Sequence, residues 1–143
     1  MPMPILAPAA VLILWSVIML LWMLGTRIPA IMKLKIPSEQ SIGGRGSDLD
    51  KVLPRETQWK AHNYNHLMEQ PTIFYAVVLI LAVIGQGSGF NVKLAWGYVI
   101  LRILHSLWQS LVNTVDVRLG LFALSTIALG MLAVNALRAT LGF

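Results

Sequence analysis

Residues 5–24 read ILAPAAVLILWSVIMLLWML, a stretch in which Ser16 is the only polar side chain. A helix needs about 20 apolar residues to cross the hydrocarbon core of a bilayer, so this stretch predicts a first membrane span. A secretory signal peptide would carry positive charge ahead of a shorter apolar core. No Lys or Arg precedes Arg27, and we therefore expect the segment to be retained.

The composition of the chain is typical of a membrane protein. Of the 143 residues, 57% are hydrophobic and 12% are charged, whereas soluble domains average roughly 45–50% and about 25%. Further apolar stretches predict one transmembrane domain over residues 1–143, an all-α antiparallel bundle of four helices. Its spans are expected at about 5–30, 57–85, 94–115 and 117–138.

Basic residues gather between the first two apolar stretches, where seven of the eleven lie: Arg27, Lys33, Lys35, Arg45, Lys51, Arg55 and Lys60. Positive charge marks cytoplasmic loops, so the loop at about 36–54 is expected in the cytoplasm and both termini outside. Its glycine-rich part, residues 42–48 (IGGRGSD), follows no strand and predicts a flexible connection. Because no organelle signal is visible, we expect a bacterial inner membrane, with a eukaryotic reticulum membrane as the alternative.

Composition also excludes some classes of function. The formal charge of +5 comes with no basic stripe interleaved with aromatic residues, so we expect no nucleic-acid partner. Cysteine is absent, which excludes a disulfide framework, a thiolate metal site and a cysteine nucleophile. Any sulfur chemistry must therefore come from a bound molecule.

A polar stripe runs along the predicted third span. Tyr98, Arg102, His105, Gln109 and Asn113 recur at steps of four, three, four and four, which places them on one helix face. An arginine in the hydrocarbon core costs roughly 2.5–3.5 kcal/mol on insertion scales. The stripe should therefore face protein or a water-filled cavity, as a functional site or as a hydrogen-bond network that holds the helices together.

The predicted second span carries a shorter stripe at steps of four and three, made of His62, His66 and Glu69. The pattern lacks the His-Glu-x-x-His order of zinc sites, and we expect no metal. Glu69 is interpreted as an ion-pair partner or as an acceptor for a ligand's ammonium group. By helix rise, Glu69 and Arg102 differ in depth by about 10 Å, so His105 and Gln109 match Glu69 better.

Arg118 falls in the first turn of the predicted fourth span, two residues after Asp116, which is expected to cap that helix. A helix N-terminus offers unpaired N–H groups and a positive dipole end. A guanidinium at this place suits an anionic ligand. The alternative is an interfacial cation that follows the positive-inside rule.

Residues 60–62 (KAH) and 65–74 (NHLMEQPTIF) resemble the second-helix pattern of one membrane-protein family, and Arg102, His105 and Arg118 resemble positions in its third and fourth helices. This is the MAPEG family, the membrane-associated proteins in eicosanoid and glutathione metabolism, which includes microsomal glutathione transferases, leukotriene C synthase and microsomal prostaglandin E synthase. The resemblance implies a homotrimer of four-helix subunits. It also implies that glutathione binds between neighbouring subunits, near the cytoplasmic side.

The resemblance further implies roles for individual residues. Arg118 would lie beside the glutathione thiol as the catalytic residue, and Lys33 or Lys35 would supply a cation from the first helix. The residues expected to bind glutathione are Lys60, His62, Asn65, His66, Glu69, Arg102, His105 and Gln109.

The chain also departs from the family pattern. Asn65 and Glu69 are four residues apart where the family has three. Lys60 stands in place of an arginine and lacks its planar fork. Gln109 or Trp108 stands where the family has a tyrosine.

Three functions are therefore considered. The first is a membrane-bound, glutathione-dependent transferase or peroxidase that acts on lipophilic electrophiles by thiolate attack, with the bilayer, its own copies and a lipophilic small molecule as partners. The alternative is a non-catalytic membrane binding or assembly protein of the same fold, since fold does not dictate activity. A small carrier with a polar path is the third, but no inverted repeat supports it.

Overall fold

A computed structural model describes residues 3–143, and the structural statements below concern these residues. Their regular structure is entirely helical, as predicted. The helices are α1 (Leu6–Leu34), α2 (Ser38–Ser41), the 3-10 helix η1 (Gly46–Lys51), α3 (Arg55–Leu67), α4 (Pro71–Val83), α5 (Phe90–Leu111) and α6 (Val115–Leu141).

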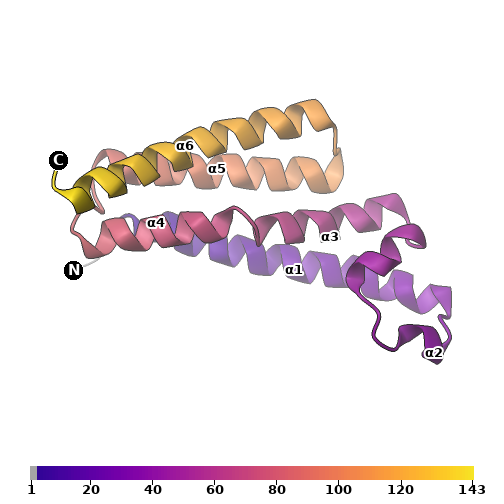
Figure 1. Cartoon of the computed structure of the whole chain (residues 1–143). Coiled ribbons are helices and arrows are strands. Elements are labelled where there is room, and N and C mark those ends of the chain that lie inside the picture. The colour runs from indigo at the N-terminus through magenta and orange to yellow at the C-terminus, as the bar shows by residue number, and fades with distance from the viewer. Residues whose placement is uncertain (1–2) are drawn as a thin grey trace.

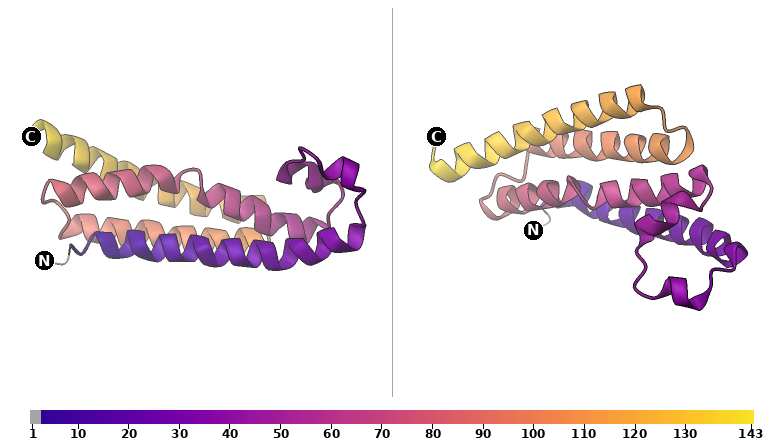
Figure 2. Two further views of the ribbon diagram at one scale, coloured as in Figure 1. Left: turned by 90° about the horizontal axis from the view of Figure 1, so that it is seen from below. Right: turned by 45° about the vertical axis from the view of Figure 1, so that its right-hand side comes forward.

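The long helices lie side by side, and the chain reverses direction between α1 and α3, between α4 and α5, and between α5 and α6 (Figure 1). Helices α3 and α4 follow one another along the same line, and α5 packs most closely against α6. The start of α1 and the end of α6 lie at one end of the molecule, while α2 and η1 lie at the other, as the further views in Figure 2 confirm. We call these the termini end and the loop end.

Three helical segments are long and apolar enough to cross a membrane: Leu6–Leu34, Arg55–Val83 and Val115–Leu141. Helix α5 is not among them, because polar side chains such as Asn91, Lys93 and Arg102 interrupt its apolar sequence. A fourth crossing by α5, and with it a four-span bundle, stays a prediction.

The second span was expected as one helix that runs through Pro71, and this detail is wrong. Helix α3 ends at Leu67 and α4 begins at Pro71. Proline has no backbone N–H, and its ring clashes with the carbonyl four residues earlier, which here belongs to Leu67. Proline is instead favoured at the first position of a helix, so it ends α3 and begins α4.

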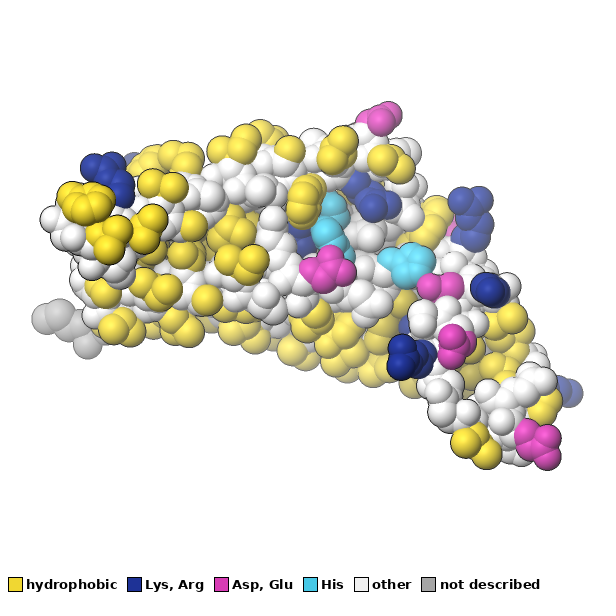
Figure 3. Space-filling view, in the orientation of Figure 1, with side chains coloured by type: hydrophobic (Ala, Val, Ile, Leu, Met, Phe, Trp, Pro, Cys, Tyr) yellow, Lys and Arg dark blue, Asp and Glu magenta, His cyan; other side chains and the backbone are white. Residues whose placement is uncertain are grey.

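The connection at 36–54 is more ordered than the flexible loop predicted, since it contains α2 and η1. The connection is tethered to the long helices at two points, one of them in its glycine-rich part. Arg27 of α1 donates a hydrogen bond to the Gly46 carbonyl, and Nε2 of Gln58 in α3 donates to the Leu53 carbonyl at 2.6 Å. Figure 3 shows charged side chains gathered at this loop end, whereas apolar side chains cover most of the remaining face.

The cap of α6 also differs from expectation. Thr114 occupies the N-cap position, and Asp116, predicted to cap the helix, lies in its first turn. Thr114 makes no side-chain cap bond, because its hydroxyl accepts a hydrogen bond from the Trp108 indole at 2.9 Å. Asp116 still places negative charge near the positive end of the helix dipole.

Candidate functional site

A ladder of polar contacts joins the α3–α4 line to α5. Asn63 Nδ2 donates to Ser106 Oγ at 2.8 Å, and Tyr98 Oη donates to Gln70 Oε1 at 3.2 Å. Between these two rungs, His66 contacts α5. Because α5 runs antiparallel to the α3–α4 line, residues later in that line contact residues earlier in α5. Ser106 also accepts a hydrogen bond from the Trp15 indole at 3.0 Å, so one hydroxyl joins α1, α3 and α5.

The stripe predicted on the third span is buried for most of its length. Tyr98, Arg102, His105 and Gln109 are all 5% exposed or less, which confirms that they share one inward face. Asn113 does not belong to that face, because α5 ends at Leu111. Its backbone is left-handed (φ 61°), a conformation that asparagine adopts more readily than most residues, and it forms the turn into α6.

Arg102 is fully buried, and no described carboxylate lies within 4.0 Å of it. Its Nη2 donates to the His66 carbonyl at 3.3 Å, and Nη1 lies 3.4 Å from His66 Nε2. His66 is in the last turn of α3, where its carbonyl accepts the Glu69 backbone N–H at 3.3 Å and where the helix dipole is negative. The end of α3 therefore offsets this buried charge, in agreement with the depth difference that spoke against a direct pair of Arg102 with Glu69.

Glu69 pairs with a different residue from those predicted. Its carboxylate lies 3.2 Å from His66 Nδ1, and its side chain is 68% exposed. His105 and Gln109 do not reach it, because helix rise sets depth but not the direction in which each side chain leaves its helix. With Glu69 on Nδ1 and Arg102 on Nε2, the partners favour a neutral His66 imidazole protonated at Nδ1.

His66 and His105 meet at the mouth of a cavity near the loop end. Their ring centroids are 4.9 Å apart, and Phe122 of α6 lies 5.6 Å from His66. The cavity measures about 210 Å³ and is lined by His66, His105, Arg118 and Phe122, with Val115 and Leu119. We call it the His–Arg cavity. It contains donors from three helices and no acidic lining residue, which suits an anionic ligand.

Arg118 is half-buried in the wall of this cavity. Its Nη1 donates to Asn113 Oδ1 at 2.6 Å, which ties the guanidinium to the α5–α6 turn. Its Nε is buried and has no partner among the described residues. Among the described residues the guanidinium donates only to Asn113, from Nη1, so Nη2 is left for a ligand beside the N-terminus of α6.

The structure brings together only part of the predicted site. His66, His105 and Arg118 line the cavity, Arg102 lies behind His66, and Gln109 is buried with an unpartnered Oε1. Three other predicted residues lie apart: the Lys60 ammonium is 5.5 Å from the Trp22 ring, His62 is 3.2 Å from Asp50, and Asn65 is exposed. The described residues contain no group of three or more His, Asp or Glu placed to hold a metal ion.

Sequence reasoning missed Asn63, Gln70, Ser106 and Phe122. A signal existed for the first two, because Asn63, His66 and Gln70 recur at steps of three and four and so share a helix face. The predicted stripe of His62, His66 and Glu69 has equally good helical spacing. Only the contacts with α5 show that the first set faces inward.

A search of curated proteins and of solved structures found no match to this chain. The model of the MAPEG family matches residues 5–138, which is most of the sequence and includes every residue of the His–Arg cavity. With its all-helical structure and three apolar helices long enough to cross a bilayer, the chain is an integral membrane protein that belongs to the MAPEG family.

Proposed function

We propose that this protein is a glutathione-dependent transferase or peroxidase that acts on lipophilic electrophiles, with the glutathione thiol placed in the His–Arg cavity. The observation that carries the proposal is the position of Arg118. Its guanidinium lines the cavity at the N-terminus of α6 and keeps a buried, unpartnered Nε. A cation and a helix dipole at one place favour a thiolate over a thiol.

The chemistry needs this help, because a free thiol with a pKa near 8.5 is mostly protonated at neutral pH. Once the thiol proton has passed to water, the sulfur electron pair attacks the electrophilic carbon and the leaving group departs with its own pair. With a lipid hydroperoxide, two glutathione molecules are oxidised to the disulfide while the hydroperoxide is reduced to an alcohol and water. Membership of the MAPEG family supports glutathione as the thiol.

The His–Arg cavity of one subunit is too small for the whole tripeptide. Its 210 Å³ lies below the roughly 300–1,000 Å³ of ordinary ligand pockets. Asn65 and Glu69 are exposed and do not line it. We therefore propose a homotrimer in which these side chains, with Lys60, hold the glutathione backbone in the cavity of a neighbouring subunit.

The proposed orientation of the protein in the membrane gives glutathione access to the cavity. The α5–α6 turn, to which Arg118 donates a hydrogen bond, is at the loop end (Figure 1), together with the basic connection at 36–54. We propose that this end faces the cytoplasm, as the positive-inside rule predicts, with both termini outside. This orientation requires α5 to be a fourth crossing. Water-soluble glutathione then reaches the cavity directly from the cytoplasm. We propose a bacterial inner membrane as its location.

Calorimetric titration of glutathione into purified, detergent-solubilised protein tests the proposal, together with turnover of an aromatic electrophile. Wild type should bind glutathione, and Arg118→Ala should lose at least about tenfold in turnover, equivalent to roughly 1.4 kcal/mol, with a smaller change in affinity. Arg55→Ala is the matched control, because Arg55 is an exposed cation at the same end. Equal turnover in the two variants would contradict the role of Arg118.

A second candidate is a non-catalytic membrane binding or assembly protein of the same fold. The hydrogen bond from Arg118 to Asn113 favours it, since a guanidinium that ties the α5–α6 turn has a structural use without any ligand. In that case the wild-type protein would show no heat of glutathione binding. Arg118→Ala would then lower only the thermal stability of the protein.

A further inference from the structure

The termini end of the molecule carries two adjoining cavities that the proposed function does not use. One is lined mainly by polar groups, among them Gln86, Asn91 and Arg138, and the other by apolar ones, among them Met131 and Val134. Each measures about 450 Å³. They share two lining residues, Phe90 and Asn135, and so adjoin as one open surface groove, which we call the channel, with a polar head and an apolar tail.

The polar head is held in place by side-chain amides. Asn135 Nδ2 of α6 donates to Asn91 Oδ1 of α5 at 2.8 Å, and Asn91 Nδ2 donates to the Gln86 carbonyl at 2.9 Å. This chain of bonds joins α6, α5 and the connection after α4. The head therefore keeps its shape without a ligand, which lowers the cost of binding one.

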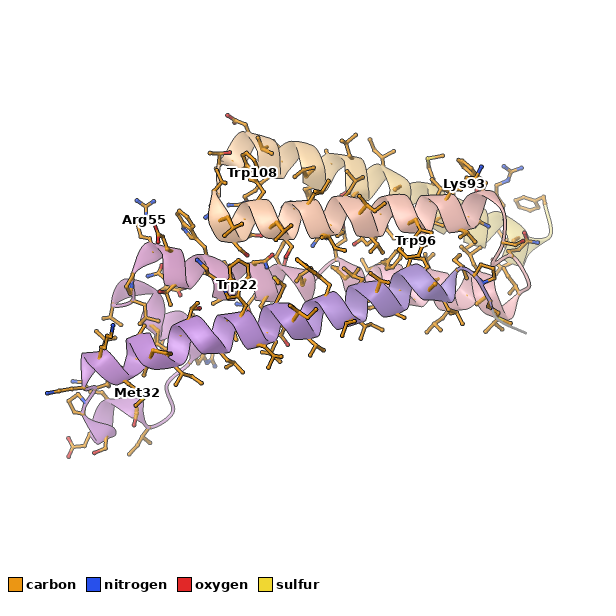
Figure 4. All side chains as sticks on the ribbon, turned by 180° about the vertical axis from the view of Figure 1, so that it is seen from behind. Trp22, Met32, Arg55, Lys93, Trp96 and Trp108 are labelled. Carbon is orange, nitrogen blue, oxygen red and sulfur yellow. The ribbon has the colours of Figure 1, made fainter. Side chains whose placement is uncertain are left out.

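The charge of this end favours an anion. Between Glu69 and the end of the sequence Asp116 is the only acidic residue, and it lies at the other end of α6. Arg138 is exposed within the head and pairs with no described carboxylate. Lys93 lies at the same end of the molecule (Figure 4) but lines neither cavity, so Arg138 is the cation that a ligand in the head would meet.

The dimensions match one leaflet of a bilayer. The apolar tail reaches Ile127, eleven residues before Arg138 on α6. At the rise of a helix these residues span about 16 Å, roughly half of a hydrocarbon core of about 30 Å. The head thus lies at the level of lipid headgroups when the tail lies within one leaflet.

We infer that this channel binds one anionic phospholipid, with its phosphate at Arg138 and an acyl chain along Phe90, Gly130 and Val134. A second copy of the chain would not need a polar head in series with an apolar tail. A free fatty acid would leave most of the head unfilled, because its carboxylate is far smaller than a glycerophosphate group.

Native mass spectrometry of the full-length protein, released from nanodiscs, tests the site. The discs contain equal amounts of phosphatidylglycerol and phosphatidylethanolamine with identical chains, and a second set contains oleate. Wild type should retain phosphatidylglycerol in preference to the other two. Arg138→Gln should lower that retention about fivefold, as expected for one cation near a lipid surface.

A second variant blocks the tail. A Cβ at Gly130 meets nothing within 4 Å, so Gly130→Leu is tolerated by the fold and places its side chain in the channel. Gly120→Leu is its matched control, because Gly120 is also exposed on α6 with open space but lines neither cavity. Lys93→Gln is the matched control for charge. Gly130→Leu should lower retention of phosphatidylglycerol at least about threefold, and both controls should leave it unchanged.

Several results would overturn the inference. Equal retention of the two phospholipids, or of oleate and phosphatidylglycerol, would exclude a phospholipid site selected by charge. An equal loss of phosphatidylglycerol retention in Lys93→Gln and Arg138→Gln would show only that the basic end attracts anionic lipid in general. Wild-type retention in both Arg138→Gln and Gly130→Leu would show that the lipid binds elsewhere. Circular dichroism of each variant establishes that it is folded before its lipids are counted.

Discussion

Arg102 Nη2 donates a hydrogen bond to the backbone carbonyl of His66 at 3.3 Å, so a buried guanidinium caps the end of α3 from the neighbouring helix. The break before Pro71 creates this acceptor. Without it, the His66 carbonyl would accept a regular helical bond from residue 70; with it, the carbonyl accepts the Glu69 N–H at 3.3 Å and keeps a lone pair for Arg102. The proline in α4 and the arginine in α5 therefore depend on one another.

Replacement of Arg102 should impair folding more than chemistry. Arg102→Leu removes the cap from α3 and should destabilise the protein by about 1–3 kcal/mol, as when a buried hydrogen-bond partner is lost. We expect low yield and a reduced melting temperature in detergent. Arg55→Leu, at an exposed position, should behave as wild type. A stable and correctly assembled but inactive Arg102→Leu protein would instead place Arg102 in the catalytic group.

Two neighbouring asparagines should have opposite roles. Asn63 is 1% exposed and donates to Ser106 at 2.8 Å, so Asn63→Ala should lower stability by about 1–3 kcal/mol. Asn65 is exposed, and Asn65→Ala should change stability by less than about 0.5 kcal/mol.

Under the proposed function, Asn65→Ala should weaken glutathione binding. Thermal unfolding and calorimetric titration of both variants separate the two roles. Loss of stability in Asn65→Ala with none in Asn63→Ala would contradict the assignment of Asn63 to the helix interface.

The pH dependence of bound glutathione should report on Arg118. A nearby cation favours the thiolate, so the thiol pKa in wild type should lie below the free value of about 8.5. The ultraviolet thiolate band should then appear at lower pH in wild type than in Arg118→Ala. Arg118→Lys should be intermediate, because the charge remains while the planar fork is lost. An unchanged thiol pKa in Arg118→Ala would show that Arg118 only ties the turn to Asn113.

The assembly of subunits can be measured directly. A single subunit leaves Glu69 and Asn65 exposed, and polar groups at membrane depth are costly when they face lipid. We expect the mass of the protein in mild detergent to be that of a trimer. A monomer at all protein concentrations would contradict the proposed sharing of glutathione between subunits.

The sequence by itself determined the long apolar helices and the membrane environment in which they lie. Three local properties can be read from neighbouring residues. They are the apolar stretches longer than a bilayer requires, the scarcity of charge within them, and the cluster of cations in one connection. The inward face of α5 was also determined locally, because Tyr98, Arg102, His105 and Gln109 repeat with the period of a helix.

The tertiary structure decided which polar groups meet. Helical spacing allowed two faces along residues 62–70, one with His62 and Glu69 and one with Asn63 and Gln70, and only packing against α5 selected the second. The partner of Arg102, like the amide contact that joins Asn91 to Asn135 across 44 positions, depends on how two helices are rotated and aligned. Rotation and alignment are set by the fit of whole helix surfaces, and no short stretch of sequence contains that information.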